Sequence, residues 1–286
     1  SDMYASRTIY AYDDSTDADA NYMIRINSEG SVIKGYDATH RLILSGEKCT
    51  ATRGRGLLGI YTKNCEASNI DFKNLTAIKG PGLGTNTTGN KVTNCTFDKL
   101  TSTTQHGGAI FMSNAISITI DGCKFSDCKL TATGGYYGGA IGCSNGSSII
   151  KVKDSTFDKC STSSSGGGGA IGTGKSLVID GNVTISNCSA TSGNGGAIVN
   201  KDASFFTANW LLLNIQTSEF CDVLSIPSNP EDLFVLIDVN GRNLVPLNKE
   251  LNPSNTMIID HHDVNEATLI SENILKIKEI SIIDFN

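Results

Sequence analysis

Residues 107–110 read Gly-Gly-Ala-Ile (GGAI), and the same four letters return three times in this chain. The other copies begin at Gly138, Gly168 and Gly195, so the spacings are 31, 30 and 27 residues. Identical copies at a nearly constant spacing indicate a repeat architecture, because a period of 20–50 residues is typical of solenoids, propellers and arrays. The recurrence of GGAI therefore restricts the candidate folds to repeat architectures.

A six-residue block precedes each GGAI. Its copies are CTFDKL (95–100), CKFSDC (123–128), STFDKC (155–160) and VTISNC (183–188), and IDFKNL (70–75) is an earlier copy without a GGAI. Small or apolar residues at its first and third positions follow the two-residue period of a strand with one buried face. Two polar residues at its fourth and fifth positions break that period. We therefore expect a corner there, before the next strand.

A third apolar run lies between each GGAI and the next block, as in the alternation of Ile116, Ile118 and Ile120. Each repeat thus contains about three short strands, and no helical spacing of apolar residues occurs before residue 200. Coils of about 25–32 residues with three strands each predict an all-β, right-handed parallel β-helix, in which equivalent residues stack about 4.8 Å apart. A propeller blade would need more residues and antiparallel strands. Glycine suits the corner, because it tolerates unusual backbone angles.

The chain changes character after the last GGAI. Of its 30 glycines, 29 precede residue 200, whereas four of its five prolines follow it. We predict an N-terminal cap or irregular first turns over 1–67, repeats over 68–215 and a β-rich C-terminal cap or module over 216–286. In this last segment, Asn240-Gly241 between two apolar runs (233–247) predicts a hairpin. Residues 255–260 and 274–285 predict further strands, and 265–276 a short helix.

Charge and composition exclude several classes of function. The net charge is −6 and the pI is about 5.2, without a basic cluster, so we expect no nucleic-acid partner. No apolar run reaches 18 residues, so we expect no membrane span, and the first residues do not form a signal peptide. DDSTDAD (13–19) and DHHD (260–263) lack the full pattern of a metal site and are interpreted as a loop and a strand end. We expect neither metal nor cofactor.

Nine cysteines are present, and several share a position in the repeat. Cys128, Cys160 and Cys188 form one column, and Cys95 and Cys123 another. In stacked coils such residues are close enough for a disulfide. The first interpretation is a ladder of small buried reduced residues; disulfides between coils are the second. Zinc is the third, since no suitable pair of C-x-x-C motifs occurs.

Catalysis needs paired groups, and the best pair is Asp98 with Asp158. They share a column two coils apart, about 10 Å by the strand spacing, near the ~6.5–9.5 Å of inverting glycosidases. However, Lys99, Asp127 and Lys159 alternate in sign along the next column, which is typical of a solvated charge ladder. Catalysis by these carboxylates is therefore the alternative hypothesis.

The loops directly before each GGAI are rich in groups suited to recognition. When the repeats are aligned on GGAI, one residue from each loop falls on a common ridge, and two more lie beside it. Hydroxyls, amides and exposed aromatic rings suit a sugar or a protein surface, although a merely solvated corner is also compatible with this composition. The ridge comprises His106, Tyr137, Gly167 and Asn194, with Gln105 and Tyr136 beside them.

GGAI with an aromatic-led block resembles the repeats of chlamydial-type polymorphic outer membrane proteins, whose second motif is F-x-x-N. The resemblance covers about residues 68–200. The aromatic position matches at Phe72, Phe97, Phe125 and Phe157, whereas the Asn position holds Leu75, Leu100, Cys128 and Cys160. The resemblance implies an extracellular passenger that is exported across an outer membrane and used in adhesion.

The wider group, the pectin-lyase-like β-helices, includes adhesins and polysaccharide-cleaving enzymes, so the fold alone does not decide the function. Its lyases use clustered calcium-binding acids and an arginine base, and no such cluster falls in register here. Arg53 and Arg55 are expected in a loop. We therefore expect an adhesin-like protein, extracellular or on an outer-membrane surface, that binds a glycan or a partner protein. A polysaccharide lyase or glycoside hydrolase is the alternative.

Overall fold

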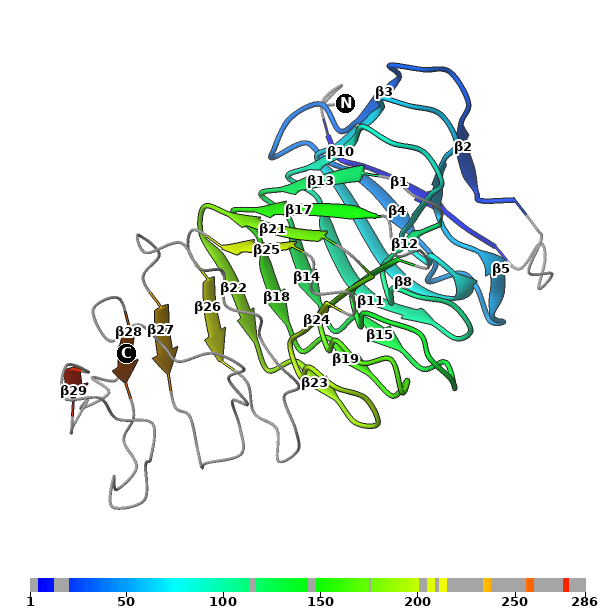
Figure 1. Ribbon diagram of the computed structural model, residues 1–286. Helices are drawn as coiled ribbons and strands as arrows, with labels where there is room; N and C mark the ends of the chain where they lie inside the picture. The colour runs from blue at the N-terminus through cyan, green and yellow to red at the C-terminus, as the bar shows by residue number, and fades with distance from the viewer. Residues whose placement is uncertain are drawn as a thin grey trace, which may run out of the picture.

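The structure, a computed structural model, describes residues 5–12, 21–113, 117–143, 148–174 and 176–200, and the backbone of five later strands. Throughout this described part the regular secondary structure is β, and the chain forms a parallel β-solenoid of about five turns (Figure 1). The predicted all-β parallel β-helix is confirmed. Its right-handed sense stays a prediction.

Each coil passes in turn through three parallel sheets, called C, A and B. The main path of sheet A is β1 (Arg7–Tyr10), β4 (Leu42–Ser45), β8 (Ile70–Lys79), β11 (Thr96–Ser102), β14 (Lys124–Ser126), β18 (Thr156–Asp158), β22 (Val183–Ser186) and β26 (Leu211–Asn214). Beside that path lie β5 (Arg53–Arg55), β15 (Lys129–Leu130), β19 (Ser161–Thr162) and β23 (Ser189–Ala190).

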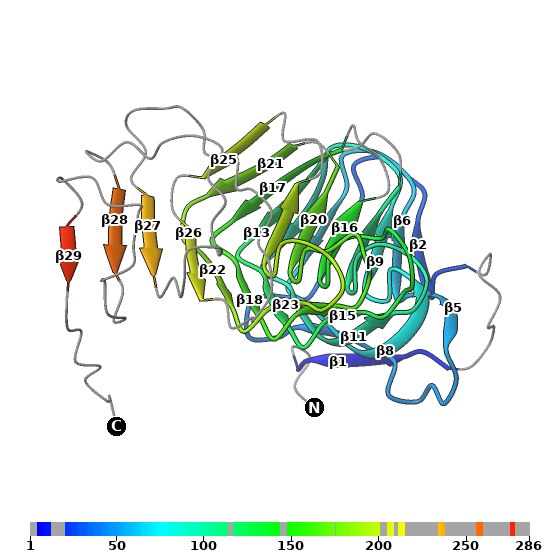
Figure 2. The same cartoon turned by 60° about the horizontal axis from the view of Figure 1, so that its bottom comes forward.

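Sheets B and C each take one strand from each coil (Figure 2). Sheet B contains β2 (Ile24–Ile26), β6 (Leu58–Ile60), β9 (Leu83–Thr85), β12 (Ile110–Met112), β16 (Ile141–Cys143), β20 (Ile171–Thr173) and β24 (Ile198–Asn200). Sheet C contains β3 (Val32–Lys34), β7 (Glu66–Ser68), β10 (Asn90–Thr93), β13 (Ser117–Asp121), β17 (Ile149–Lys153), β21 (Ser176–Asp180) and β25 (Phe205–Ala208).

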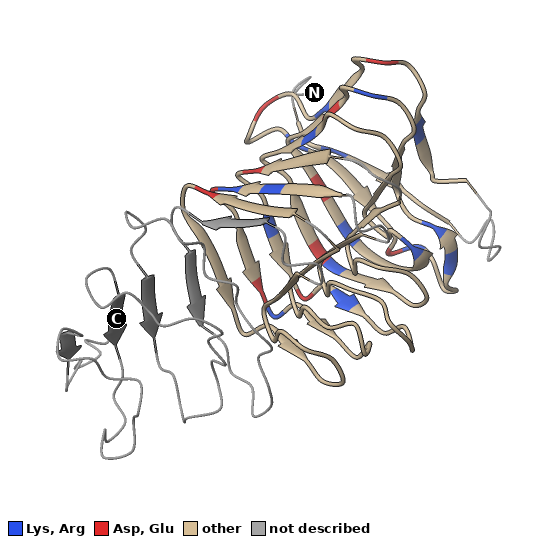
Figure 3. Cartoon of the chain, viewed as in Figure 1, with Lys and Arg blue, Asp and Glu red and all other residues tan. Residues whose placement is uncertain are grey.

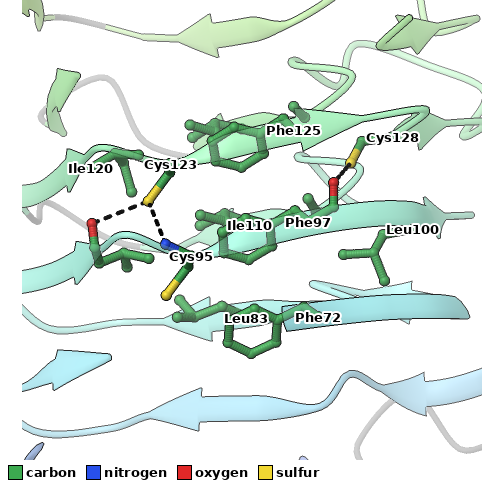
Figure 4. Packing of buried hydrophobic residues seen from close by; sticks show 14 of the residues in the cluster. Phe72, Leu83, Cys95, Phe97, Leu100, Ile110, Ile120, Cys123, Phe125 and Cys128 are labelled. Carbon is green, nitrogen blue, oxygen red and sulfur yellow. Dashed lines mark hydrogen bonds between the residues drawn. The ribbon is translucent and has the colours of Figure 1, made fainter. Parts of the chain in front are cut away.

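The core is a set of columns in which each coil repeats the side chain of the coil before. Phe72, Phe97, Phe125 and Phe157 are paired in register and buried. Their ring centroids lie 4.7, 4.7 and 4.6 Å apart, with interplanar angles of 5°, 3° and 3°. Figure 4 shows the stack of Phe72, Phe97 and Phe125. The predicted aromatic column is therefore confirmed, and its spacing equals that of hydrogen-bonded strands.

The expected corner inside the six-residue block is also present. The fifth residue of each block has a positive φ, between 51° and 56°. This left-handed conformation turns the strand direction, and it is uncommon outside glycine, asparagine and aspartate. The column consists of Asn74, Lys99, Asp127, Lys159 and Asn187.

A second left-handed column, which we did not anticipate, marks the corner between sheets C and A. Its five residues have φ between 44° and 63°. The residue types at these positions indicated the left-handed conformation, because asparagine, aspartate and glycine are the residues that most readily take it. The column consists of Asn69, Asn94, Gly122, Asp154 and Gly181.

The eight cysteines of the described residues are free thiols, seven of them buried. The Cys123 Sγ donates to the Val92 carbonyl at 3.4 Å and accepts the Cys95 N–H at 3.5 Å, and the Cys128 Sγ donates to the Phe97 carbonyl at 3.4 Å (Figure 4). Burial raises the pKa of the Cys123 thiol well above its ordinary value. The predicted cysteine columns are present, and their thiols are satisfied by the backbone.

The first 67 residues already take part in the three sheets. β1 and β4 lead into β8, β2 and β6 into β9, and β3 and β7 into β10. The expectation of a loop at Arg53 and Arg55 is wrong, because these residues form β5, which pairs with the end of β8. Arg53 is only 2% exposed, and its guanidinium donates to the carbonyl of Tyr12. A main-chain oxygen therefore stabilises its buried positive charge.

Beyond residue 200, β25 and β26 extend sheets C and A, and three strands form a separate parallel sheet: β27 (Phe234–Ile237), β28 (Thr256–Ile259) and β29 (Leu275–Ile277). β28 and β29 match the strands predicted over 255–260 and 274–285. β27, the first arm of the predicted hairpin, pairs in parallel with β28. The turn at Asn240-Gly241 and most of the expected helix lie outside the described residues.

Candidate binding surface

Both glycines of GGAI are required by close backbone contacts. The first glycine has φ of 73°, 82°, 76° and 67° in the four copies, and a Cβ on Gly138 would lie 1.9 Å from the carbonyl oxygen of Ile141. A Cβ on the second glycine, Gly139, would lie 1.9 Å from the carbonyl oxygen of Gly169 in the next coil. Alanine then pairs coil to coil and isoleucine begins the sheet B strand. GGAI is a corner and a strand start, as expected.

The loops before GGAI fold back over the outer face of sheet B. The middle residue of β16 is Gly142 and that of β20 is Gly172, and both lie beneath these loops. A Cβ at Gly142 would meet the Tyr137 carbonyl oxygen at 2.0 Å, and one at Gly172 would meet the Tyr137 Cβ at 2.4 Å. Both faces of these strands are therefore buried. The glycine that follows GGAI in these two repeats was an available signal, and our sequence interpretation missed it.

His106 is held inside this layer. It is 7% exposed, its ring stacks on Tyr137 with centroids 5.2 Å apart and an interplanar angle of 22°, and its Nδ1 accepts the Tyr137 main-chain N–H at 3.0 Å. The neutral ring therefore carries its proton on Nε2. Burial lowers the pKa of His106 to about 4.

Tyr136 lies at the edge of the same cluster. Its ring meets His106 edge to face, with centroids 5.1 Å apart at 82°, and its main-chain N–H donates to the buried Ser164 Oγ at 2.9 Å. The Ser164 hydroxyl in turn donates to the Gly134 carbonyl, which the Ser165 hydroxyl also reaches at 2.8 Å. The loop that carries Tyr136 is thus bound to the loop of the next coil.

The structure brings together part of the predicted ridge. Main-chain hydrogen bonds at the GGAI corners join the coil that carries Tyr137 to the coils on both sides of it. His106, Tyr136 and Tyr137 are in contact. Gln105 is half-buried beside His106, and Asn194 is exposed two coils from Tyr137. The interpretation of these residues as exposed rings is wrong: His106 is buried and both tyrosines are half-buried. His106 and Tyr137 lie over Gly142 of sheet B, and Tyr137 also lies over Gly172.

Asp98 and Asp158 occupy the predicted register, with Ser126 between them. Asp158 accepts the Asn187 Nδ2 at 2.8 Å and the Ser186 Oγ at 2.9 Å, and these bonds, the Asn187 one foremost, hold the pKa of its carboxyl below the ordinary value. Lysines and acidic residues both lie along the strands of sheet A (Figure 3). Asp158 is thus a bonded carboxylate within a charged face.

In the ranges that the structure describes, no three His, Cys, Asp or Glu residues cluster as a metal site would require. No helix in that part of the chain is long and apolar enough to cross a membrane. The segments 13–19 and 260–263, considered above as metal loops, lie outside the described residues.

Comparison of the chain with protein-family models, with curated proteins and with solved structures gave no match in any of the three.

Proposed function

We propose that this chain is an adhesin-like binding protein, extracellular or on an outer-membrane surface, that recognises a glycan or a partner protein. The GGAI repeats support this proposal through their resemblance to the passengers of polymorphic outer membrane proteins. The surface that we assign to recognition is the aromatic cluster of His106, Tyr136 and Tyr137 on the outer face of sheet B.

The observation that carries the proposal is the fixed position of the half-buried Tyr136 ring. His106 supports it from one side, and the bond to Ser164 fixes its backbone. An aromatic ring already held in place gives a large contact area while little side-chain entropy is lost on binding. Sugar ring faces and apolar protein side chains are both suitable partners for such a ring.

Tyr136→Ala is the test, because Tyr137 packs over Gly172 and serves the fold as well. Binding would be measured on a glycan array and against candidate host proteins. We expect a loss of about 2 kcal/mol, roughly thirtyfold in Kd, as for an interface hot spot. Tyr12→Ala is the matched control, since Tyr12 is 63% exposed and lies near the N-terminal end. Unchanged binding by Tyr136→Ala would contradict the assignment.

A polysaccharide lyase or hydrolase is the second candidate, and the shared register of Asp98 and Asp158 is the observation in its favour. The lowered pKa of Asp158 argues against a general acid at this position, which requires a raised one. If this candidate is right, the chain releases product from an acidic polysaccharide. Asp98→Asn or Asp158→Asn then abolishes product release, while binding survives.

A further inference from the structure

A pocket of about 370 Å³ lies at a different corner of the solenoid, where sheet C passes into sheet A. Its volume falls within the range of small-molecule sites. It is remote in the coil from the loops that precede GGAI, which join sheet A to sheet B. The lining includes Ala38, Arg41, Asp71, Asn94, Thr96 and Lys124.

Arg41 forms a fixed part of this pocket. Its Nε donates to the Asp71 Oδ1 at 2.6 Å, and its Nη2 donates to the carbonyls of Ile70 at 3.2 Å and Asn94 at 2.8 Å. The Asp71 Oδ1 also accepts the Thr96 hydroxyl at 2.7 Å. The guanidinium therefore reaches from its own coil to the second coil along, and among the described residues its Nη1 has no hydrogen-bond partner.

The wall at Ala38 is a tight turn. The Asp37 carboxylate accepts the main-chain N–H groups of Thr39 at 2.8 Å and of His40 at 2.7 Å. The main-chain N–H of Arg41 donates to the hydroxyl of Ser6, the residue before β1, at 3.0 Å, which ties the turn to the start of sheet A. These hydrogen bonds hold the turn that forms this wall of the pocket.

Lys124 completes the pocket one coil beyond Thr96, with which it is paired in register. Gly122 lies at the corner just before it, where the preceding coils carry Asn69 and Asn94. Within the described part of the chain, Lys124 has no ion-pair partner. The lining holds two cations, Arg41 and Lys124, and one carboxylate, so its net charge is positive although that of the whole chain is −6.

The geometry points to an anion-binding pocket that holds one carboxylate or sulfate group of a hydroxyl-rich ligand between Arg41 and Lys124. Nη1 of Arg41 and Nζ of Lys124 donate to the anion, and an ion next to a guanidinium and an ammonium forms the stronger class of hydrogen bond. The Asp71 carboxylate, whose charge Arg41 balances, accepts a neighbouring hydroxyl of the ligand. This site goes beyond the proposed function, since it uses no residue of the aromatic cluster.

The test is calorimetric titration of the whole chain with D-glucuronate, glucose 6-sulfate and glucose. We expect both anions to bind, glucose not to, and Lys124→Gln to weaken anion binding about tenfold. The tighter of the two anions identifies the group that the pocket prefers. Lys124 is exposed, so this variant keeps the fold. Lys91→Gln is the matched control, because it removes another exposed positive charge, from β10 and outside the pocket lining.

Three results would overturn the site. They are anion binding that Lys124→Gln leaves intact, glucose binding as tight as anion binding, and no anion binding up to about 10 mM, beyond which affinity is negligible. Tyr136→Ala is expected to bind both anions like the unaltered chain. A loss of anion binding in that variant would place the site at the aromatic cluster instead. The two assignments therefore stand or fall separately.

Discussion

The main-chain N–H of Tyr137 donates to the Nδ1 of His106 in the preceding coil across 3.0 Å. This bond between coils can form only while Nδ1 carries no proton. Protonation of Nδ1 would place its N–H opposite the main-chain N–H of Tyr137, and the hydrogen bond would be lost. The ring is 7% exposed, and this burial lowers its pKa from 6.5 to about 4. The aromatic cluster on sheet B therefore requires neutral His106.

We expect stability to fall in acid because of this histidine. Its pKa is lower in the folded chain than in the unfolded chain, so its full contribution is present above about pH 6.5 and is lost as the pH falls toward 4. The loss by about pH 5 is on the order of 2 kcal/mol. Urea unfolding at several pH values measures it. In His106→Asn, whose side-chain oxygen still accepts a hydrogen bond, the free energy of unfolding is expected to fall by that much less between about pH 6.5 and pH 5. Equal slopes would show that His106 does not titrate in this way.

Phe125→Ala is expected to destabilise the chain by about 3–5 kcal/mol. The ring is 1% exposed and stacked on both sides, by Phe97 and Phe157, so its removal leaves a cavity that neighbouring coils cannot close. The midpoint of denaturant unfolding reports the change. Tyr36→Ala, at a ring 64% exposed, is the control and should shift the midpoint very little. A similar small shift for Phe125→Ala would mean that the column is not the core.

Gly139→Ala and Gly135→Ala form a matched pair of substitutions. A Cβ at Gly139 would lie 1.9 Å from the Gly169 carbonyl oxygen, whereas one at Gly135 meets nothing within 4 Å. We expect the first to cost about 1–3 kcal/mol or more and the second to be near neutral. Thermal unfolding of both variants distinguishes the cases. Equal melting temperatures would remove the steric explanation of GGAI.

The thiols are expected to be reduced and unreactive in the folded chain. The thiolate is the reactive form, and burial raises the pKa of Cys160. A hydrogen bond with Cys160 raises the pKa of Cys188 as well. Among the eight thiols of the described residues, alkylation followed by mass spectrometry should modify the half-buried Cys49 first and the seven buried thiols only after denaturation. Disulfides between coils in intact protein would contradict this and indicate an oxidising compartment.

The solenoid could be predicted because its determinants recur along the chain. GGAI and the aromatic position report the same local constraint once per coil, so alignment of the repeats places Phe97 opposite Phe125 without knowledge of the structure. The left-handed column of Asn69, Asn94 and Gly122 could have been found by the same alignment.

The environment of the candidate site could not be predicted in this way. Whether His106 faces solvent or sheet B depends on how loops of unequal length fold back, and this is a contact between coils with no fixed spacing in sequence. Arg41 illustrates the same limit, since it bonds to Ile70 and Asn94 in two later coils. The residue types suggested recognition, whereas burial decided which side chains are available for it.

The contact of the second GGAI glycine with the coil that follows it has an evolutionary consequence. A Cβ on Gly108, Gly139 or Gly169 would in each case lie 1.9 Å from the carbonyl oxygen of the equivalent glycine in the next coil, so each junction between coils has the same geometry as the others. A duplication that inserts one whole repeat would lengthen the molecule by one increment of about 4.8 Å and leave every existing junction intact. An insertion of part of a repeat would break a junction unless it fell in a loop. The length of such a solenoid can therefore change in steps, while its cross-section stays constant.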